Sequence, residues 1–185
     1  AQNGHADVLQ LLVASGANVN TARTTDGATP VFMAAQMGHA DVLQLLVASG
    51  ANVNTAMTTD GCTPVLIAAQ QGHAEVVQVL VASGANVNTA LTTDGCTPVY
   101  TAACNGHADA LQLLVASGAN VNTALTTDGC TPVYTAACNG HMDVLQLLVA
   151  SGANVNTALT TDGATPAYIA AENGHVDVLQ PLVAS

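Results

Sequence analysis

A glycine-histidine pair recurs along the chain at a constant interval, and this interval constrains the fold more than any other feature. The histidines, each 34 residues after the previous one (39 − 5 = 34), are His5, His39, His73, His107, His141 and His175. A fixed period of this length is typical of solenoids, in which each unit packs only against its neighbours. We expect one elongated domain over residues 1–185, with a half unit at 1–25 and repeats that begin at Asp26, Asp60, Asp94, Asp128 and Asp162.

The repeated letters predict two short helices in every unit. In the first unit, Thr29 is placed to cap a helix, and Pro30 suits the first helical position because its missing N–H is not needed there. Gly38 ends this helix, since glycine takes the left-handed conformation that a C-cap requires. A second helix follows directly, with Asp41 in its first turn and Gly50 at its end. The segment NVNTARTTDG then carries turn-forming residues to the next Thr-Pro.

Apolar residues surround more than half of each second helix, so a single helix pair cannot bury them. In the first unit they are Val42, Leu43, Leu45, Leu46 and Val47. Stacking successive pairs covers these faces, because every unit supplies a partner for the next. The stretch NTALTTDGCTPVYTAACNGH occurs twice without a change, at 88–107 and 122–141. Such identity indicates either recent duplication or deliberate design.

At these residues the chain resembles the ankyrin repeat family. The family pattern of Gly-x-Thr-Pro, Ala-Ala, Gly-His and Gly-Ala-Asp-Val-Asn is matched closely in the first unit by Gly27–Pro30, Ala34–Ala35, Gly38–His39 and Gly50–Asn54. The resemblance covers essentially the whole chain. It implies an all-α solenoid of stacked helix-turn-helix units joined by β-turn or hairpin-like fingers, with partners bound on the concave face.

Three departures from the family pattern change local expectations. The period is one residue longer than the usual ~33, and the extra residue lies in the finger, which we expect to be reshaped. Pro181 replaces a leucine, and we expect the last helix to bend or fray there, because proline removes a helical hydrogen bond. The family's histidine after Thr-Pro-Leu is also replaced, so its usual hydrogen bond is lost or remade by a phenol. The replacements are Phe32, Leu66, Tyr100, Tyr134 and Tyr168.

The charge balance restricts the class of partner. Twelve acidic residues accompany a single base, Arg23, and the formal net charge is −11. Nucleic acid and anionic membrane surfaces are bound largely through Lys and Arg, so this chain repels both. The apolar runs are also far shorter than the ~20 residues of a membrane-spanning helix. The partner that remains is another protein with a neutral or basic surface, unless the acids serve solubility alone.

Two Cys-x-x-His pairs, Cys104 with His107 and Cys138 with His141, are the best candidates for a metal site. Equivalent positions on stacked helices lie about 8–10 Å apart, whereas zinc ligands lie within ~2.3 Å of the metal, so we expect no metal. The same spacing exceeds the ~7 Å Cα separation that a disulfide permits. Free thiols favour a reducing, intracellular compartment.

The acids also give no support for catalysis. They form two columns, one in the fingers and one at the starts of the second helices, with only Glu172 outside them. Members of a column recur once per unit, which is too far apart for two carboxylates to act together. We therefore expect no catalytic residues and no cofactor.

Three columns that vary between units form the candidate binding surface, because partners of the resembling family are usually bound at these positions. The finger column holds Arg23 and then Met57, Leu91, Leu125 and Leu159. The column after the turn glycine includes Cys62, Cys96 and Cys130. The ends of the first helices hold Gln36, Met37, Gln70, Gln71, Cys104, Asn105, Cys138 and Asn139. An apolar stripe at the finger tips indicates a partner contact, although tips tucked against the neighbouring finger, or ordinary isolated exposure, explain it equally well.

The leading hypothesis is a non-catalytic module that binds a partner protein along the fingers and first helices. One alternative is a structural span of a longer array, which the near-identity of the units favours. The chain begins in mid-pattern at Ala1, which fits such an excerpt. In a variant of this alternative, the two ends of the stack, which lack polar capping units, associate with one another. A designed consensus array would explain the uniformity, but designers usually add surface lysine, and this chain has none.

Overall fold

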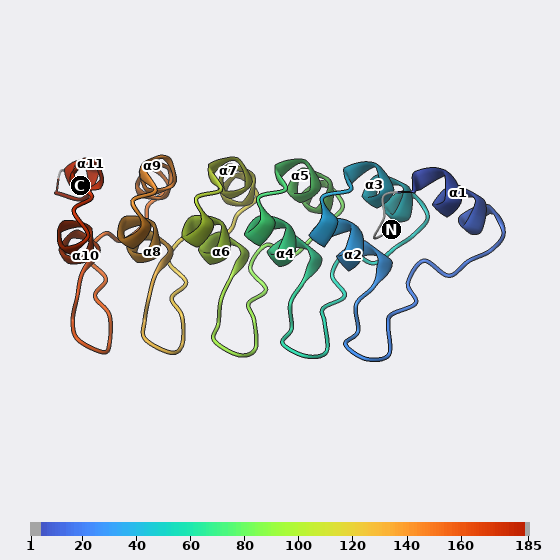
Figure 1. Ribbon diagram of the computed structural model, residues 1–185, viewed down its shortest axis with the longest axis horizontal. Coiled ribbons are helices and arrows are strands. Elements are labelled where there is room, and N and C mark those ends of the chain that lie inside the picture. Colours follow the sequence, from blue (N-terminus) through green and yellow to red (C-terminus); the bar gives the residue numbers. More distant parts are fainter. Residues whose placement is uncertain (1–4, 184–185) are drawn as a thin grey trace.

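The computed structural model describes residues 5–183, and within them the secondary structure is entirely helical, in two rows (Figure 1). The inner helices lie next to the fingers and are α2 (Pro30–Met37), α4 (Pro64–Gln71), α6 (Pro98–Asn105), α8 (Pro132–Asn139) and α10 (Pro166–Glu172). The outer helices form the second row and are α1 (Ala6–Ala14), α3 (Ala40–Ala48), α5 (Ala74–Ala82), α7 (Ala108–Ala116), α9 (Met142–Ala150) and α11 (Val176–Val183). The fingers all project from the inner row on the side away from the outer helices (Figure 1). The predicted all-α solenoid is confirmed.

Each inner helix begins at the predicted threonine-proline pair. The Thr29 hydroxyl accepts a hydrogen bond from the Phe32 N–H at 3.2 Å, and Pro30 is the first helical residue. The threonines that cap the other inner helices accept the equivalent bond. Gly38 ends α2 with a φ of 74°, in the left-handed region, as predicted. Local side-chain chemistry therefore sets both ends of this helix.

The outer helices from α1 to α9 each follow directly after a histidine and are followed by a serine. Asp41 lies in the first turn of α3, where its charge favours the positive end of the helix dipole. The Ser49 hydroxyl donates to the Leu45 carbonyl at 2.7 Å at the other end. The ring of His73 reaches back to the preceding unit, with its Nε2 3.2 Å from the Gln36 carbonyl oxygen. The histidines before α7, α9 and α11 make the equivalent contact, so each outer helix from α5 onward is tied to the inner helix of the unit before it.

The core lies between the two rows and runs along the stack. Each inner helix contacts the next inner helix, and each outer helix contacts the next outer one. Leu111 and Leu114 of α7 are fully buried, as are Leu43 and Leu46 at the same positions of α3. At the N-terminal end of the described stack no further helix pair packs on α1, and its Leu11 is 69 % exposed. Burial of the apolar faces thus depends on a neighbour on each side, as the sequence predicts.

Repeated hydrogen bonds join adjacent units outside the core. In the fingers, the Thr58 N–H donates to the Asp26 carbonyl of the preceding finger at 2.8 Å, and each later finger does the same. In the turns after the outer helices, the Asn52 N–H donates to the Asn20 side-chain oxygen at 2.7 Å. The Asn20 amide in turn donates to the Gly50 carbonyl at 3.2 Å. These bonds fix the register of one unit on the next.

Of the bend or fraying expected at Pro181, the fraying is wrong, because α11 continues through this residue to Val183. Pro181 is the sixth residue of the helix, so its ring removes one hydrogen bond only one turn after the start. Leu182, which follows, is buried and anchors the last turn against the core. None of the helices within residues 5–183 combines the length and the hydropathy needed to cross a membrane.

Candidate functional site

A groove of about 490 Å³ runs across the first three fingers and the inner helices beside them. Its lining from the fingers includes Arg23, Met57 and Leu91, and its lining from the inner helices includes Leu66 and Ile67. We call this hollow the finger groove. Three successive units contribute to it, so an occupant must extend along the stack rather than sit within one unit.

The apolar finger residues line the groove but are not exposed tips. Met57 and Leu91 are half-buried and pack against the core. The Met57 N–H donates to the Cys62 carbonyl at 2.8 Å and closes the finger loop, which leaves Thr58 and Thr59 as the exposed residues of the turn. Leu125 and Leu159, at the same position of later fingers, are also half-buried. These side chains are therefore partly tucked in, which is one of the alternatives that the sequence left open, and they offer only part of their surface.

The cysteines that follow the turn glycine are buried, which corrects their place among the contact residues. Cys62 is 6 % exposed, and Cys96 and Cys130 are each 7 % exposed. Burial, with a smaller contribution from the neighbouring carboxylates, raises the pKa of Cys62 and Cys96 to about 12. These thiols stay protonated at neutral pH and have almost no surface to offer a partner, because the residue before each helix cap turns inward.

The residues at the ends of the inner helices divide into two groups. Gln36 and Gln70 line the finger groove, and Gln70 is exposed while Gln36 is half-buried. The other six positions lie outside this hollow, although all are at least partly exposed: Met37, Gln71, Cys104, Asn105, Cys138 and Asn139. Two of their amides already have partners: Asn105 donates to the Thr101 carbonyl of its own helix, and Asn139 donates to the Cys104 carbonyl of the preceding unit. The groove thus gathers part of the predicted surface.

Several groove residues were missed by the sequence prediction. Phe32, Ile67 and Thr101 line the groove from the inner helices. Asp60 and Asp94 line it from the fingers, although the sequence placed them only in a recurring acidic column. The Ile67 column also varies between units, as Met, Ile, Thr, Thr and Ile, and that variation was the signal available to find it.

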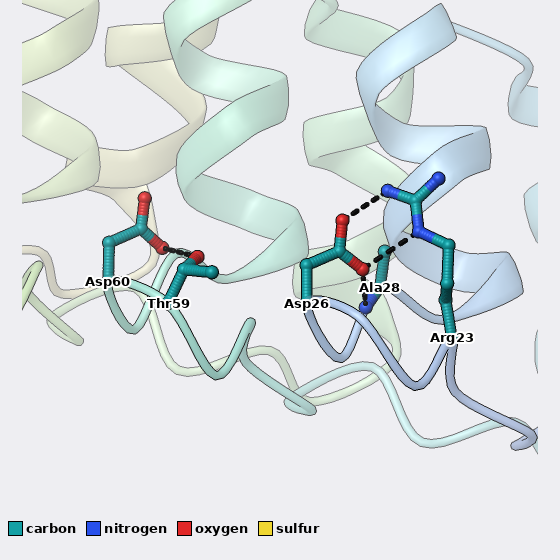
Figure 2. A network of polar contacts seen from close by, with 5 residues as sticks. All are labelled: Arg23, Asp26, Ala28, Thr59 and Asp60. Atoms are coloured by element: carbon teal, nitrogen blue, oxygen red, sulfur yellow. Dashed lines mark hydrogen bonds and ion pairs between the residues drawn. The ribbon is translucent and has the colours of Figure 1, made fainter.

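One ion pair marks the end of the groove. The guanidinium of Arg23 donates to both carboxylate oxygens of Asp26, with 2.8 Å between Nε and Oδ1 (Figure 2). Hydrogen bonds from Arg23 and then from the Ala28 N–H lower the pKa of Asp26 to about 2. The pair is therefore intact at neutral pH, and its contribution to folding is lost only as the pH falls through that value.

A phenol replaces the family's histidine contact in the middle of the stack. The Tyr100 hydroxyl donates to the Cys130 sulfur of the next unit at 3.4 Å, and burial raises its pKa far above the ordinary value. Phe32 and Leu66 have no polar atom at this position, so there the bond is lost. The sequence prediction allowed both outcomes, and each occurs.

A second hollow, of about 480 Å³, lies at the N-terminal end of the stack between α1 and α2. Leu9 and Leu12 of α1 and Met33 of α2 contribute to its lining. Apolar side chains on the same helix are exposed, with Val8 at 55 % and Leu12 at 50 %. This hollow lies at the end of the array, where α1, the first finger and α2 line it, whereas three successive fingers line the finger groove.

Comparison with known proteins agrees with this architecture. The family model described as ankyrin repeats (3 copies) matches residues 1–57, 54–124, 88–158 and 123–185, which together cover the chain. A search of curated proteins gave no match. With the helix pairs, the capping threonines and the fingers all in the places that the repeat demands, the chain belongs to the ankyrin repeat family.

Proposed function

We propose that this chain is a non-catalytic module that binds another protein along its finger and inner-helix face. Ankyrin repeats are generally protein–protein interaction modules. The observation that carries the proposal for this chain is the finger groove, which combines partly exposed apolar side chains with amides and carboxylates. Such a mixture suits protein recognition, because apolar groups supply contact area while polar groups set orientation.

The chemistry of the face supports binding rather than catalysis. Burial raises the pKa of the Cys62 and Cys96 thiols beside the groove to about 12, so they supply no thiolate nucleophile at neutral pH. The finger carboxylates recur once per unit instead of converging on one point. A catalytic site requires a nucleophile and a base in contact, and the groove offers a repeated surface instead.

The proposal predicts that filling the groove abolishes partner capture. Gln70→Trp places a large side chain at an exposed position of α4 that lines the groove. The matched control is Gln78→Trp on α5, which is equally exposed but lies on the outer row. Proteins captured from native cell extract by the unmodified chain and the two variants are compared by mass spectrometry.

We expect a specific partner to be retained by the control and lost from Gln70→Trp. Helical content of both variants is measured by circular dichroism, so that a folding defect is not mistaken for lost binding. A partner that remains on Gln70→Trp at unchanged yield would contradict the proposal, because the groove would then not be its binding surface.

Self-association through the stack end is a second candidate function. The exposed apolar residues of α1, Val8, Leu11 and Leu12, favour it, since large exposed apolar patches tend to become interfaces. Light scattering over a wide concentration range separates the candidates. A mass that stays near 18.3 kDa contradicts self-association, whereas a mass that rises with concentration supports it.

A further inference from the structure

The fingers carry a column of carboxylates, and only the first has a cation from the chain itself. In that finger Arg23 pairs with Asp26, whereas Met57 and Leu91 occupy the arginine's position in the next two fingers. Figure 2 shows the contrast: the guanidinium of Arg23 binds Asp26, whereas among the residues drawn Asp60 receives the hydroxyl of Thr59, at 3.3 Å, and no cation. The first finger therefore shows how a guanidinium fits onto this carboxylate.

One oxygen of each carboxylate is already used by the fold. Oδ1 of Asp60 accepts the Cys62 N–H at 2.9 Å, and Oδ1 of Asp94 accepts the Cys96 N–H at 3.0 Å. Within residues 5–183, Oδ2 of these two side chains accepts no hydrogen bond, whereas Oδ2 of Asp26 receives the Arg23 guanidinium. A second acceptor thus stays open at two successive fingers.

Both open carboxylates line the finger groove beside apolar side chains. Asp60 and Asp94 share the groove with Leu66, Ile67 and Leu91. The chain carries a net charge of −11 with one base, so its own cations cannot neutralise them. The groove is therefore complementary to a segment that carries positive charges with apolar residues between them.

The spacing of the units selects the conformation of that segment. Packed helices lie about 8–10 Å apart, so equivalent carboxylates of adjacent fingers repeat at about that distance. A β-strand presents side chains on one face every ~6.6 Å, which does not match. A polyproline II segment has three residues per turn and rises about 3.1 Å per residue, so it presents every third side chain on one face at ~9 Å intervals.

We propose that the finger groove binds a polyproline II segment of a partner protein with Arg or Lys at every third residue, its cations pairing with Asp60 and Asp94. The apolar residues between the cations pack on the half-buried side chains of Met57 and Leu91. Arg23 lies at one end of the groove and repels a further cation there, so the paired stretch starts at the second finger. This inference rests on the proposed function and names the chemistry of the partner.

The test uses a fluorescent peptide of about twelve residues that repeats Arg-Pro-Leu, with binding to the whole chain followed by anisotropy. A peptide of the same composition with its arginines grouped at one end is the register control. Asp60→Asn with Asp94→Asn removes the two charges while keeping an Oδ1 acceptor for the finger turn. The matched double variant is Glu75→Gln with Asp109→Asn, which changes the same charge at exposed positions of α5 and α7.

We expect the repeating peptide to bind more tightly than the grouped peptide. The Asp60 and Asp94 double variant should weaken it about tenfold, and the Glu75 and Asp109 variant less than about twofold, because the latter charges are screened from the groove. Circular dichroism of both variants establishes that they are folded. Raising the salt concentration should weaken binding to the unmodified chain more than to the Asp60 and Asp94 variant.

Three results would overturn the inference while leaving the proposed function intact. If the two peptides bind equally tightly, the spacing of the arginines does not matter. If the two double variants weaken peptide binding equally, the peptide is attracted by the net charge of the chain alone. If neither peptide binds but Gln70→Trp still loses its natural partner, the groove binds a protein of different chemistry. If Gln70→Trp keeps that partner, the proposed function itself has failed.

Discussion

Replacing Leu111 with alanine is expected to lower the free energy of unfolding by about 3–4 kcal/mol. The Leu111 side chain is fully buried in α7, which packs against α5, α6 and α9. Truncation removes buried apolar surface and leaves a cavity, because helices fixed on three sides cannot close around it. Chemical denaturation followed by far-ultraviolet circular dichroism measures the change.

The adjacent residue provides the control for this experiment. Gln112 is exposed on the same helix, and Gln112→Ala should change the unfolding free energy by less than about 0.5 kcal/mol. A loss below about 1 kcal/mol for Leu111→Ala would contradict the packing described for the middle of the stack.

Gly72→Ala is expected to destabilise the chain by about 2–3 kcal/mol, for two reasons that act together. Gly72 has a φ of 73°, where an alanine is strained. A Cβ atom there would also lie 2.5 Å from Nδ1 of the His107 ring, which must move. That ring has its Nε2 3.1 Å from the Gln70 carbonyl oxygen, so moving it disrupts the hydrogen bond that ties two units together.

Gly84 separates these two contributions. Its φ is 84°, but a Cβ added there meets nothing within 4 Å, so Gly84→Ala carries only the backbone strain, about 1 kcal/mol. The free energies of unfolding of the two variants, measured by thermal and chemical denaturation, should therefore differ. The difference is the contribution of the steric clash and of the disrupted hydrogen bond in Gly72→Ala. Equal destabilisation would show that the histidine ring adapts without loss, and that the contact between units is weaker than described.

The helices could be predicted from the sequence because their ends depend on neighbouring residues in the chain. A threonine that caps its own helix, as Thr29 does, and a glycine that ends it, as Gly38 does, act within one turn. The stacking followed from the apolar circumference of the outer helices. The expectation of fraying at Pro181 failed because a helix tolerates proline according to the position of the proline in the helix and to the packing around it. The burial of Leu182 is not evident from the neighbouring sequence.

The binding surface was less predictable because side-chain direction around a turn depends on contacts with the next unit. The sequence left open whether Met57 is exposed or tucked in, and the loop closes beyond it and turns its side chain partly inward. Cys62 was expected on the surface and is buried. Asp60 was recognised as a recurring acid, but its place in the groove follows only from the inner helices that line the other side.

The measurement that tests the account most directly is photo-crosslinking from partly or fully exposed glutamine positions on both rows of helices. A photoreactive residue replaces Gln36 or Gln70 in the finger groove, and Gln44 or Gln78 on the outer helices α3 and α5. The account predicts that a partner in native extract crosslinks from the two groove positions and not from the two outer ones. A partner that crosslinks from Gln44 or Gln78, with none at Gln36 and Gln70, would contradict it.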